Sequence, residues 1–371
     1  MNYYIFLRYN FRTIDNPIFD MIKNPDNIVV IYAKLKTNYL RKEKELEDAW
    51  NIFAEELIDV GINCYEFNGS IDELKILIKT IKENNNNIVL EDVPTLLFPS
   101  IDKEYKLCKP FFNYNLKNNI VVFANSEFFF RKKHTSHKVH INDLSLVVYT
   151  KKDYKKNKQK EVQKIWAEIL KSNLIPLYAD KRDYLDAEYT SHLSTYINSG
   201  QISIRQIWKD TIKKYGNTEG GKKFLSELGW RDFAYHQFHY HTTMTWKNLN
   251  NNINIIYDNN EMFFNNWKSG KTGVPIIDAG MNQLREEGWI PNRIRMLVAS
   301  FLTKNLKVCW QKGAEYFLEQ LVDADPVINA LNWQWVAGTG TDYMPHFRVF
   351  NPSLQAKKYD KDGIYQNKWK L

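Results

Sequence analysis

The sequence predicts a small α/β domain followed by a larger all-helical domain. Apolar, strand-like runs alternate with amphipathic helical segments in the first part of the chain, whereas later segments show helical periodicity alone. Between them, the basic stretch KKDYKKNKQK at 151–160 has low hydrophobicity and is typical of a surface linker. We therefore expect an α/β domain over residues 1–150, a linker over 151–175 and a helical domain over 176–371.

Hydrophobic patterning justifies each element of the first part. Tyr3–Tyr9 and Ile28–Tyr32 are apolar runs typical of buried strands. RKEKELEDAWNIFAEELIDVG at 41–61 has the apolar spacing of a helix and ends at Gly61. A strand at 62–67, a helix at 70–83 and an apolar run at 87–91 follow, which predicts a Rossmann-like parallel sheet built from βαβ units.

The second part is expected to consist of helices. No Gly-rich phosphate loop of the Rossmann or Walker type follows the first strand, so the α/β part is not the obvious place for a nucleotide cofactor. The expected helices are Thr190–Ser199, Ser203–Tyr215, Gly221–Phe238, Ile277–Glu287, Asn292–Lys304 and Ala314–Val322.

Composition narrows the class of protein. The 371 residues are 44% hydrophobic and 15% aromatic, with a formal net charge of +8. That charge favours an anionic partner, nucleic acid before membrane surface, although a Lys-rich surface can simply be solvated. Three cysteines without paired spacing argue against a disulfide framework and a Cys-based zinc site. Neither a signal peptide nor a membrane-length apolar run is expected, which predicts an intracellular, cytoplasmic or DNA-associated protein.

Three short motifs carry polar groups in unusual settings. TSHLS at 190–194 is either a capping cluster or an anion site at a helix start, and WRDF at 230–233 can be a core helix with one ion pair. Arg293 and Arg295 lie in an otherwise apolar helix, where each needs a carboxylate or phosphate partner. Candidate partners are the aspartates of LVDAD at 321–325, and we expect no metal site there because a third ligand at suitable spacing is missing.

Six motifs in a fixed order carry a family resemblance. They are TSHLS (190–194), SELGWRDF (226–233), TGVPIIDAGMNQLREEGWIPNRIRMLVASFL (272–302), LVDADP (321–326), NWQWVAGTGTD (332–342) and FRVFNP (347–352). Together they resemble the flavin-binding domain of the photolyase/cryptochrome family, specifically class I cyclobutane pyrimidine dimer photolyases. RYNFRTIDNP at 8–17 is similar to the Arg-rich opening of the same family. The resemblance covers nearly the whole chain and is strongest from Tyr178 onward.

The resemblance implies FAD, folded into a U shape within the helical domain and active in its reduced, anionic form. Asn329 would face N5 of the flavin, and Arg295 would pair with Asp323 beneath the ring. His192 departs from the family, which carries Arg there, so a phosphate contact is expected to be weakened. The implied cofactor-binding residues are Tyr178, Thr190, Ser191, His192, Leu193, Ser194, Phe224, Arg295, Asp323, Ala324, Asp325 and Asn329.

The resemblance also implies an enzyme that repairs UV-damaged DNA in the light, a deoxyribodipyrimidine photo-lyase. Electron transfer from excited reduced FAD would split a cyclobutane pyrimidine dimer that is flipped out of the duplex. The implied catalytic residues are Glu227, Asn329, Met296, Trp230 and Trp335. The implied DNA-binding residues are Arg182, Glu227, Trp230, Asn292, Arg293, Met296, Trp335, Arg348 and Gln355.

A chain of three tryptophans photoreduces FAD in this family. Trp333 and Trp310 occupy its two inner positions, whereas the outer position falls on Tyr257. A tyrosine donates an electron readily only if its phenolic proton, with a pKa of about 10, leaves as well. We therefore expect slower photoreduction, with Tyr257 as the terminal donor or with Trp267 or Trp246 in its place.

Other members of the family remain alternatives. A cryptochrome-type blue-light photoreceptor would share the fold, but Glu227 with Trp230 and the short C-terminus disfavour it. A six-four photolyase would need a His pair where this chain has residues 290–293, and a single-strand-preferring photolyase tends to have Gln in place of Met296. A flavin-free, non-catalytic nucleic-acid-binding protein is the alternative outside the family. We further expect a monomer whose shortened N-terminal domain binds an antenna chromophore weakly or not at all.

Overall fold

A computed structural model gives the fold of the chain in two compact units. Unit 1 comprises Met1–Leu96, Val121–Lys171 and Leu193–Asp210, and unit 2 comprises Leu97–Ile120, Ser172–His192 and Thr211–Leu371. The structure describes residues 3–8, 11, 12, 16, 19, 28–35, 39–83, 87–90, 106, 108–109, 146–148, 158–185, 189–250, 255–258, 260–342 and 348–370.

Unit 1 contains a five-stranded sheet in the order β4-β1-β2-β3-β5. Each of the pairs β1–β2, β1–β4 and β2–β3 is parallel, as the βαβ pattern predicts. The edge strand β5 instead runs antiparallel to β3, and its three residues are too few for a periodicity signal. The strands are β1 (Tyr3–Leu7), β2 (Ile28–Leu35), β3 (Asn63–Gly69), β4 (Asn87–Leu90) and β5 (Leu146–Val148).

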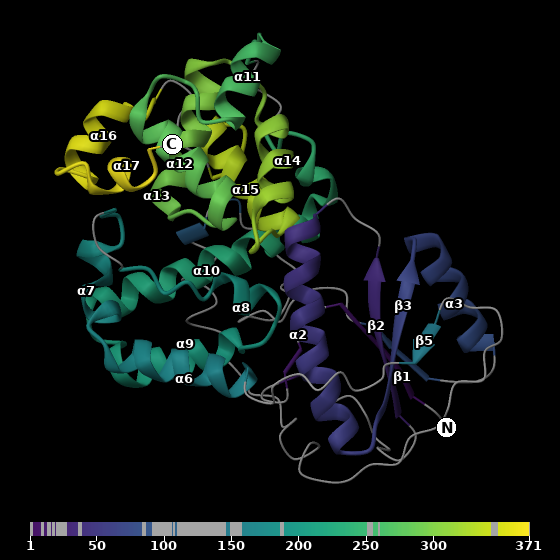
Figure 1. The fold of residues 1–371 in the computed structure, drawn as a ribbon. Coiled ribbons are helices and arrows are strands. Elements are labelled where there is room, and N and C mark those ends of the chain that lie inside the picture. The colour runs from purple at the N-terminus through teal and green to yellow at the C-terminus, as the bar shows by residue number, and fades with distance from the viewer. Residues whose placement is uncertain are drawn as a thin grey trace. The chain divides into compact units, whose positions relative to one another are not determined.

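Two helices cover opposite faces of this sheet (Figure 1). The helices are α2 (Leu40–Asp59) and α3 (Ile71–Glu83). Side chains alternate between the faces along each strand, so Ile5 and Val30 pack with α2, whereas Phe6 and Ile31 pack with α3. After α2 the chain reverses at Gly61, whose φ of 92° is costly for residues with a Cβ. The predicted order of strands and helices in this part is therefore confirmed.

Three further helices occur in the later segments of unit 1. They are α6 (Lys158–Lys171), α8 (Ser194–Asn198) and the first part of α9 (Ile204–Tyr215). In α6 the indole of Trp166 donates to Asp210 at 2.9 Å. The sequence analysis placed α6 within its linker because its many lysines and glutamines mask the apolar positions Val162 and Trp166. The domain boundaries at 150 and 175 stay a proposal.

Unit 2 is helical, and its described helices between Glu261 and Lys368 pack around an apolar core. The core includes Trp267, Trp310 and Trp333, each at most 2% exposed. Buried Gln334 fixes the neighbouring loop, because its side chain bonds the Leu249 amide and the Met244 carbonyl, both at 2.8 Å. The helices are α7 (Leu174–Lys181), the end of α9, α10 (Glu219–Tyr240), η1 (Thr242–Thr245), α11 (Glu261–Lys268), α12 (Pro275–Glu287), α13 (Asn292–Ser300), η2 (Phe301–Asn305), α14 (Trp310–Gln320), α15 (Pro326–Ala337), α16 (Pro352–Tyr359) and α17 (Ile364–Lys368).

Several predicted helix boundaries are wrong, and the helix expected over Ala314–Val322 runs instead from Trp310 to Gln320. The helix expected from Thr190 begins only at Ser194, since His192 has a left-handed φ of 51° that interrupts helical geometry. The helix expected over Asn292–Lys304 changes at Phe301 into a π-helical turn. Within the described residues, no helix is long and apolar enough to cross a membrane.

Candidate active site

The candidate active site in unit 2 depends on a close approach of two helices. A Cβ added to Gly220, in the first turn of α10, would lie 2.1 Å from the Ile175 carbonyl oxygen and 2.3 Å from the Pro176 carbonyl oxygen. Only glycine therefore lets α10 pack so closely on α7. Thr218 starts α10 by accepting a hydrogen bond from the Gly221 amide at 3.0 Å. This contact brings the end of α7 beside α10.

One side of α10 carries three predicted site residues at three-residue spacing. Phe224 is buried and meets the Tyr178 ring of α7 edge to face, with centroids 5.2 Å apart. Burial raises the pKa of Tyr178 to about 12. Glu227 and Trp230 follow along the helix, and both are only half-buried. Trp230 packs edge to face on Phe233 at 5.7 Å, so its ring is partly fixed and partly accessible.

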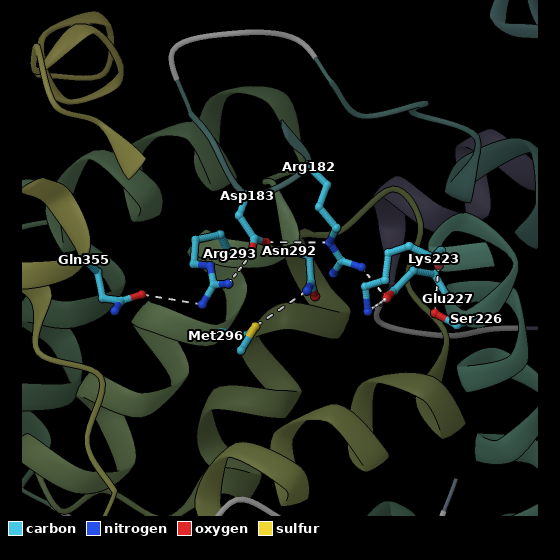
Figure 2. Close-up of polar contacts among 9 residues, drawn as sticks. All are labelled: Arg182, Asp183, Lys223, Ser226, Glu227, Asn292, Arg293, Met296 and Gln355. Atoms are coloured by element: carbon cyan, nitrogen blue, oxygen red, sulfur yellow. Dashed lines mark hydrogen bonds and ion pairs between the residues drawn. The ribbon is translucent and has the colours of Figure 1, made fainter. Parts of the chain in front are cut away.

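A charged cluster joins α7, α10 and α13 (Figure 2). We define it as Arg182, Asp183, Lys223, Glu227 and Arg293. The Glu227 carboxylate contacts Arg182 Nη1 and lies 2.7 Å from Lys223 Nζ. The Asp183 carboxylate contacts Arg293 Nη2 and lies 3.6 Å from Arg182 Nε. The sequence analysis therefore named three members of one connected network and missed the other two.

The cluster holds its charges in a partly dehydrated setting. The side chains of Arg182 and Arg293 are 11% and 13% exposed, compared with 28% for Glu227. Burial acts to lower the pKa of Arg182, but the Glu227 carboxylate outweighs it and raises that pKa. Each guanidinium can meet a phosphate, because its planar set of donors matches the phosphate oxygens.

Helix α13 brings four predicted residues to the site. Asn292 donates from Nδ2 to the Met296 sulfur at 3.6 Å, one helical turn away. Arg293 also donates to Gln355 Oε1 on α16 at 3.4 Å, and its guanidinium lies 4.5 Å above the Tyr359 ring. Figure 2 shows Gln355, Arg293 and Asn292 as a continuous group with the charged cluster.

The fourth residue of α13, Arg295, forms the ion pair that the resemblance implies. Its Nη2 donates to both carboxylate oxygens of Asp323, at 2.9 and 3.1 Å, and its Nε donates to the Ile290 carbonyl. The proposed partnership of Arg293 with LVDAD is wrong, because Arg293 pairs with Asp183 instead.

Asp325 caps a helix and binds a tyrosine hydroxyl. Its Oδ1 accepts hydrogen bonds from the Val327 and Ile328 amides and so caps α15, while its Oδ2 accepts one from the Tyr235 hydroxyl at 2.7 Å. One turn later, Asn329 donates from Nδ2 to the Ala314 carbonyl at 2.9 Å. This bond orients the amide and leaves its Oδ1 as an acceptor.

The TSHLS motif is not a helix cap. Neither of its first two hydroxyls caps α8, whose N-cap Leu193 makes no side-chain cap bond. Thr190 Oγ1 and His192 Nε2 instead lie 3.2 Å apart, and the His192 ring packs on Trp289 with centroids at 4.0 Å. The boundary between the two units falls inside this motif. Residues up to His192 belong to unit 2, whereas Leu193 and Ser194 belong to unit 1.

The tryptophans predicted for electron transfer are buried in the core. Gly313 allows α14 to pack against Trp333, because a Cβ there would lie 2.2 Å from the indole. Trp333 also meets Trp267 edge to face at 6.2 Å, and Trp310 donates to Asn248 Oδ1 at 2.8 Å. Burial and Cys309 raise the pKa of Tyr257 to about 12. Its buried hydroxyl has no hydrogen-bond partner within the described part of the chain.

The remaining predicted residues lie on α15 and beyond it. Trp335 is half-buried and packs against the core of unit 2, and Ala324 is buried beside Asp325. Arg348 is exposed, and its carbonyl accepts a hydrogen bond from Lys304 Nζ at 2.7 Å. Burial, together with the charge of Arg348, lowers the pKa of Lys304 to about 8.

Sequence reasoning missed four residues at this site. Asp183 and Lys223 complete the charged cluster, and Cys108 lies close enough for Glu227 and Lys223 to affect its pKa. The Cys108 amide donates to Asp342 Oδ2 at 2.9 Å. Asp183 directly follows Arg182 in sequence, which could have drawn attention to it. Lys223 lies one helical turn before Glu227, a spacing typical of ion pairs, and Asp342 ends the motif at 332–342, whereas no local pattern marks Cys108.

Comparisons with known proteins match the part of the chain that contains most of these residues. Residues 224–370 match the family described as the FAD binding domain of DNA photolyase. The deoxyribodipyrimidine photo-lyase of Agrobacterium fabrum is 43% identical over 191 residues, which cover 51% of this chain and 40% of that protein. The chain therefore matches less than half the length of this curated relative.

Solved structures are similar over almost the entire chain. A bacterial class III photolyase from Agrobacterium tumefaciens superposes with a TM-score of 0.83 at 26% identity, covering 99% of this chain and 86% of the other. A cryptochrome from Synechocystis shares the fold, with a TM-score of 0.82 at 22% identity over 99% of this chain and 88% of its own. The helical motifs, the Arg295–Asp323 pair and these similarities together show that residues 224–370 form a domain of the FAD-binding family of DNA photolyases, within a chain that has the fold of photolyases and cryptochromes.

Proposed function

We propose that this protein is a light-dependent DNA repair enzyme, a deoxyribodipyrimidine photo-lyase that splits cyclobutane pyrimidine dimers. The observation that carries the proposal is the position of Glu227. It lies between the cations Arg182 and Lys223, one helical turn from the half-buried Trp230, inside the region that matches photolyases. This arrangement offers a flipped-out base a carboxylate acceptor, a stacking surface and nearby phosphate partners. Class I membership stays a prediction.

The residues of unit 2 fit a bound FAD. The Asn329 amide is anchored through Nδ2, so its Oδ1 can accept a hydrogen bond from a reduced flavin. The Arg295 guanidinium is held by Asp323 yet stays 26% exposed, so it can also offer its positive charge to a reduced, anionic flavin. When bound, reduced FAD supplies the photoexcited electron for dimer splitting. Tyr178, Phe224, Asp325, Ala324 and the TSHLS residues are the further proposed contacts.

The lesion would be held by aromatic and polar side chains of α10, α13 and α15. Trp230 and Trp335 are half-buried, so each can stack on a base and contribute roughly 1–3 kcal/mol. Glu227 would accept hydrogen bonds from the pyrimidine edge, and its contacts with Arg182 and Lys223 fix the position of its carboxylate. Asn292 and Met296 are already in contact with each other and would line the same pocket.

The damaged strand would be bound through its phosphates. Arg182 and Arg293 are positioned by the charged cluster, and Gln355 is held beside Arg293. Arg348 is exposed and can reach a phosphate without breaking an ion pair of its own side chain in the described residues. Because phosphate contacts fix position while base contacts give selectivity, Glu227 and the two tryptophans would distinguish the dimer.

The proposed antenna defect concerns residues that lie mostly outside the described ones. The shortening falls between the helix at 70–83 and the segment after residue 90, where relatives have a further strand–helix unit that helps to hold an antenna chromophore. We propose that a second chromophore binds weakly or not at all, which would reduce light capture and leave the repair chemistry intact. Purified protein should then absorb as a flavoprotein alone, and a second chromophore in stoichiometric amount would contradict this.

The decisive experiment illuminates the reduced protein with an oligonucleotide that carries one thymine dimer. Recovery of thymine absorbance under blue light, and none in the dark, would support the proposed function. Glu227→Gln should retain flavin but repair the dimer more slowly, whereas Glu219→Gln, exposed at the start of the same helix, should behave as wild type. A flavin-containing protein that leaves dimers intact would favour a cryptochrome-type photoreceptor, and a flavin-free protein would favour a non-catalytic nucleic-acid-binding role.

A further inference from the structure

We propose that Asp183 is a positioning residue that sets the discrimination between damaged and undamaged DNA. It would do so by holding Arg182 and Arg293 in place and by competing with DNA phosphates for both arginines. The inference rests on the proposed repair function and adds a residue that neither the motifs nor the comparisons assign.

The geometry places Asp183 between two cations from different helices. It directly follows Arg182 at the end of α7, and its Oδ1 lies 3.6 Å from Arg182 Nε. Its Oδ2 accepts a hydrogen bond from Arg293 Nη2 on α13, 110 residues away in the sequence. Figure 2 shows Asp183 between the two guanidinium groups. One carboxylate therefore joins the two arginines that we propose for the damaged strand.

The contacts of Arg293 show what Asp183 contributes. One terminal nitrogen donates to Asp183 and the other to Gln355, and the guanidinium lies above the Tyr359 ring. Arg293 Nε is buried and has no hydrogen-bond partner in the part of the chain that the structure describes. Without the Asp183 carboxylate, this cation would keep one weak amide contact and its stacking. It could then turn toward any phosphate.

The net charge of the cluster explains how Asp183 would compete with DNA phosphates. Three cations, Arg182, Arg293 and Lys223, share two carboxylates, so the cluster carries one net positive charge. Removing Asp183 would leave a net charge of two. Since affinity for undamaged DNA comes mainly from the charge that meets phosphates, that affinity should rise. Affinity for the dimer depends also on correct placement of both arginines, so it should gain less or fall.

The test compares binding of one duplex with and without a thymine dimer, from 50 to 200 mM salt. Asp183→Asn should reduce the ratio of the two affinities at least about fivefold, and it should steepen the salt dependence for undamaged DNA by about one unit of slope. Asp180→Asn is the matched control, because Asp180 is exposed on the same helix and carries the same charge. Its ratio should stay within about twofold of wild type.

Two further variants separate positioning from mere folding. Asp183→Glu retains the carboxylate, so its ratio of affinities for damaged and undamaged duplex should be close to that of wild type. A purely steric role of Asp183 would not predict this result. If Asp183→Asn fails to fold, the same substitution in an Arg293→Gln background leaves no unpaired guanidinium at that position. There it should change the ratio by a clearly smaller factor than in the wild-type background, because only the contact between Asp183 and Arg182 remains.

The outcomes distinguish this inference from the proposed function. A wild-type protein that repairs dimers and prefers damaged DNA, together with an Asp183→Asn variant of unchanged ratio, would overturn the role of Asp183 alone. Equal effects of Asp180→Asn and Asp183→Asn would overturn it too. A wild-type protein without preference for damaged DNA and without repair would instead contradict the proposed function.

Discussion

Arg295 Nη2 donates to both carboxylate oxygens of Asp323, at 2.9 and 3.1 Å, and this pair connects α13 to the turn before α15. Asp323 is almost fully buried at 4% side-chain exposure, whereas Arg295 is 26% exposed. The aspartate therefore cannot exchange its partner for water, while one side of the arginine remains accessible. The pair therefore links α13, which carries Asn292 and Met296, to the turn before α15, the helix that carries Asn329 and Trp335.

Replacing Asp323 with Asn should destabilise unit 2. Breaking a buried pair costs about 3–5 kcal/mol, and the partial exposure of Arg295 reduces the expected loss to about 2–3 kcal/mol. Urea unfolding of the flavin-free protein measures this loss without the contribution of the cofactor. Glu319→Gln, exposed on α14, is the control and should change the free energy of unfolding by less than about 0.5 kcal/mol. Equal effects of the two substitutions would contradict a structural role for the pair.

Gly220→Ala should separate α7 from α10. The new methyl group would meet two carbonyl oxygens of α7 at little more than 2 Å, so one helix must shift. We expect a loss of about 1–3 kcal/mol in the free energy of unfolding, together with weaker binding of dimer-containing DNA because Arg182 and Glu227 move apart. Lys222→Ala, exposed on the same helix, should affect neither quantity appreciably. A stable Gly220→Ala variant with unchanged DNA binding would show that the close approach is dispensable.

Tyr257 should be a poor terminal electron donor. Its raised pKa of about 12, and a buried hydroxyl without a hydrogen-bond partner in the described residues, both oppose the loss of the phenolic proton. Tyr257→Phe should therefore change the rate of flavin photoreduction less than about twofold, whereas Tyr257→Trp should accelerate it several-fold because an indole can donate without losing a proton. Trp333→Phe serves as the positive control and should abolish most photoreduction. Transient absorption measures all three, and a collapse of the rate in Tyr257→Phe would restore Tyr257 as the donor.

Stability should fall in alkaline solution between about pH 10 and pH 12. Tyr178 and Tyr257 have pKa values near 12 in the folded chain against about 10 when unfolded. Each therefore contributes stability that is fully present below pH 10 and is lost as the pH rises to 12, at most about 2–3 kcal/mol per residue. Urea midpoints measured across this range should fall less steeply in Tyr178→Phe and in Tyr257→Phe. A parallel decline in wild type and both variants would contradict the assignment.

DNA affinity should depend on pH through Lys304. Its pKa is lowered to about 8 by burial and by Arg348, so the ammonium loses its proton between pH 7 and pH 9. Wild-type affinity should then fall about 2–5-fold over this interval, because one cation beside Arg348 disappears. Stability should move in the opposite direction, since a lysine with a depressed pKa gains stability as the pH rises. Lys304→Met should remove the pH dependence of binding, and its persistence in that variant would assign it to another group.

The sequence by itself determined those helices and strands that can be recognised from the pattern of apolar residues along the chain. The apolar runs of β1 and β2 and the helical spacing of α2 predict their own structures, because burial of alternating or periodic side chains depends on adjacent positions. The costly burial of Arg295 likewise predicts a carboxylate partner, and Asp323 fulfils that expectation. The resemblance depended on long motifs in the helical part, where residues 224–370 match the FAD binding domain of DNA photolyase.

Only the tertiary structure decided which distant residues meet. Arg293 needs a carboxylate as much as Arg295 does, yet its partner Asp183 lies 110 residues away, beyond the reach of any local pattern. The antiparallel edge strand β5, and the burial of a Tyr257 hydroxyl that has no hydrogen-bond partner among the described residues, depend in the same way on which segments pack together. Hydrophobic periodicity is a property of neighbours along the chain, whereas ion pairing and burial of single polar atoms depend on which helices approach one another. The sequence therefore determined the elements and the chemistry they need, and packing decided which residues supply it.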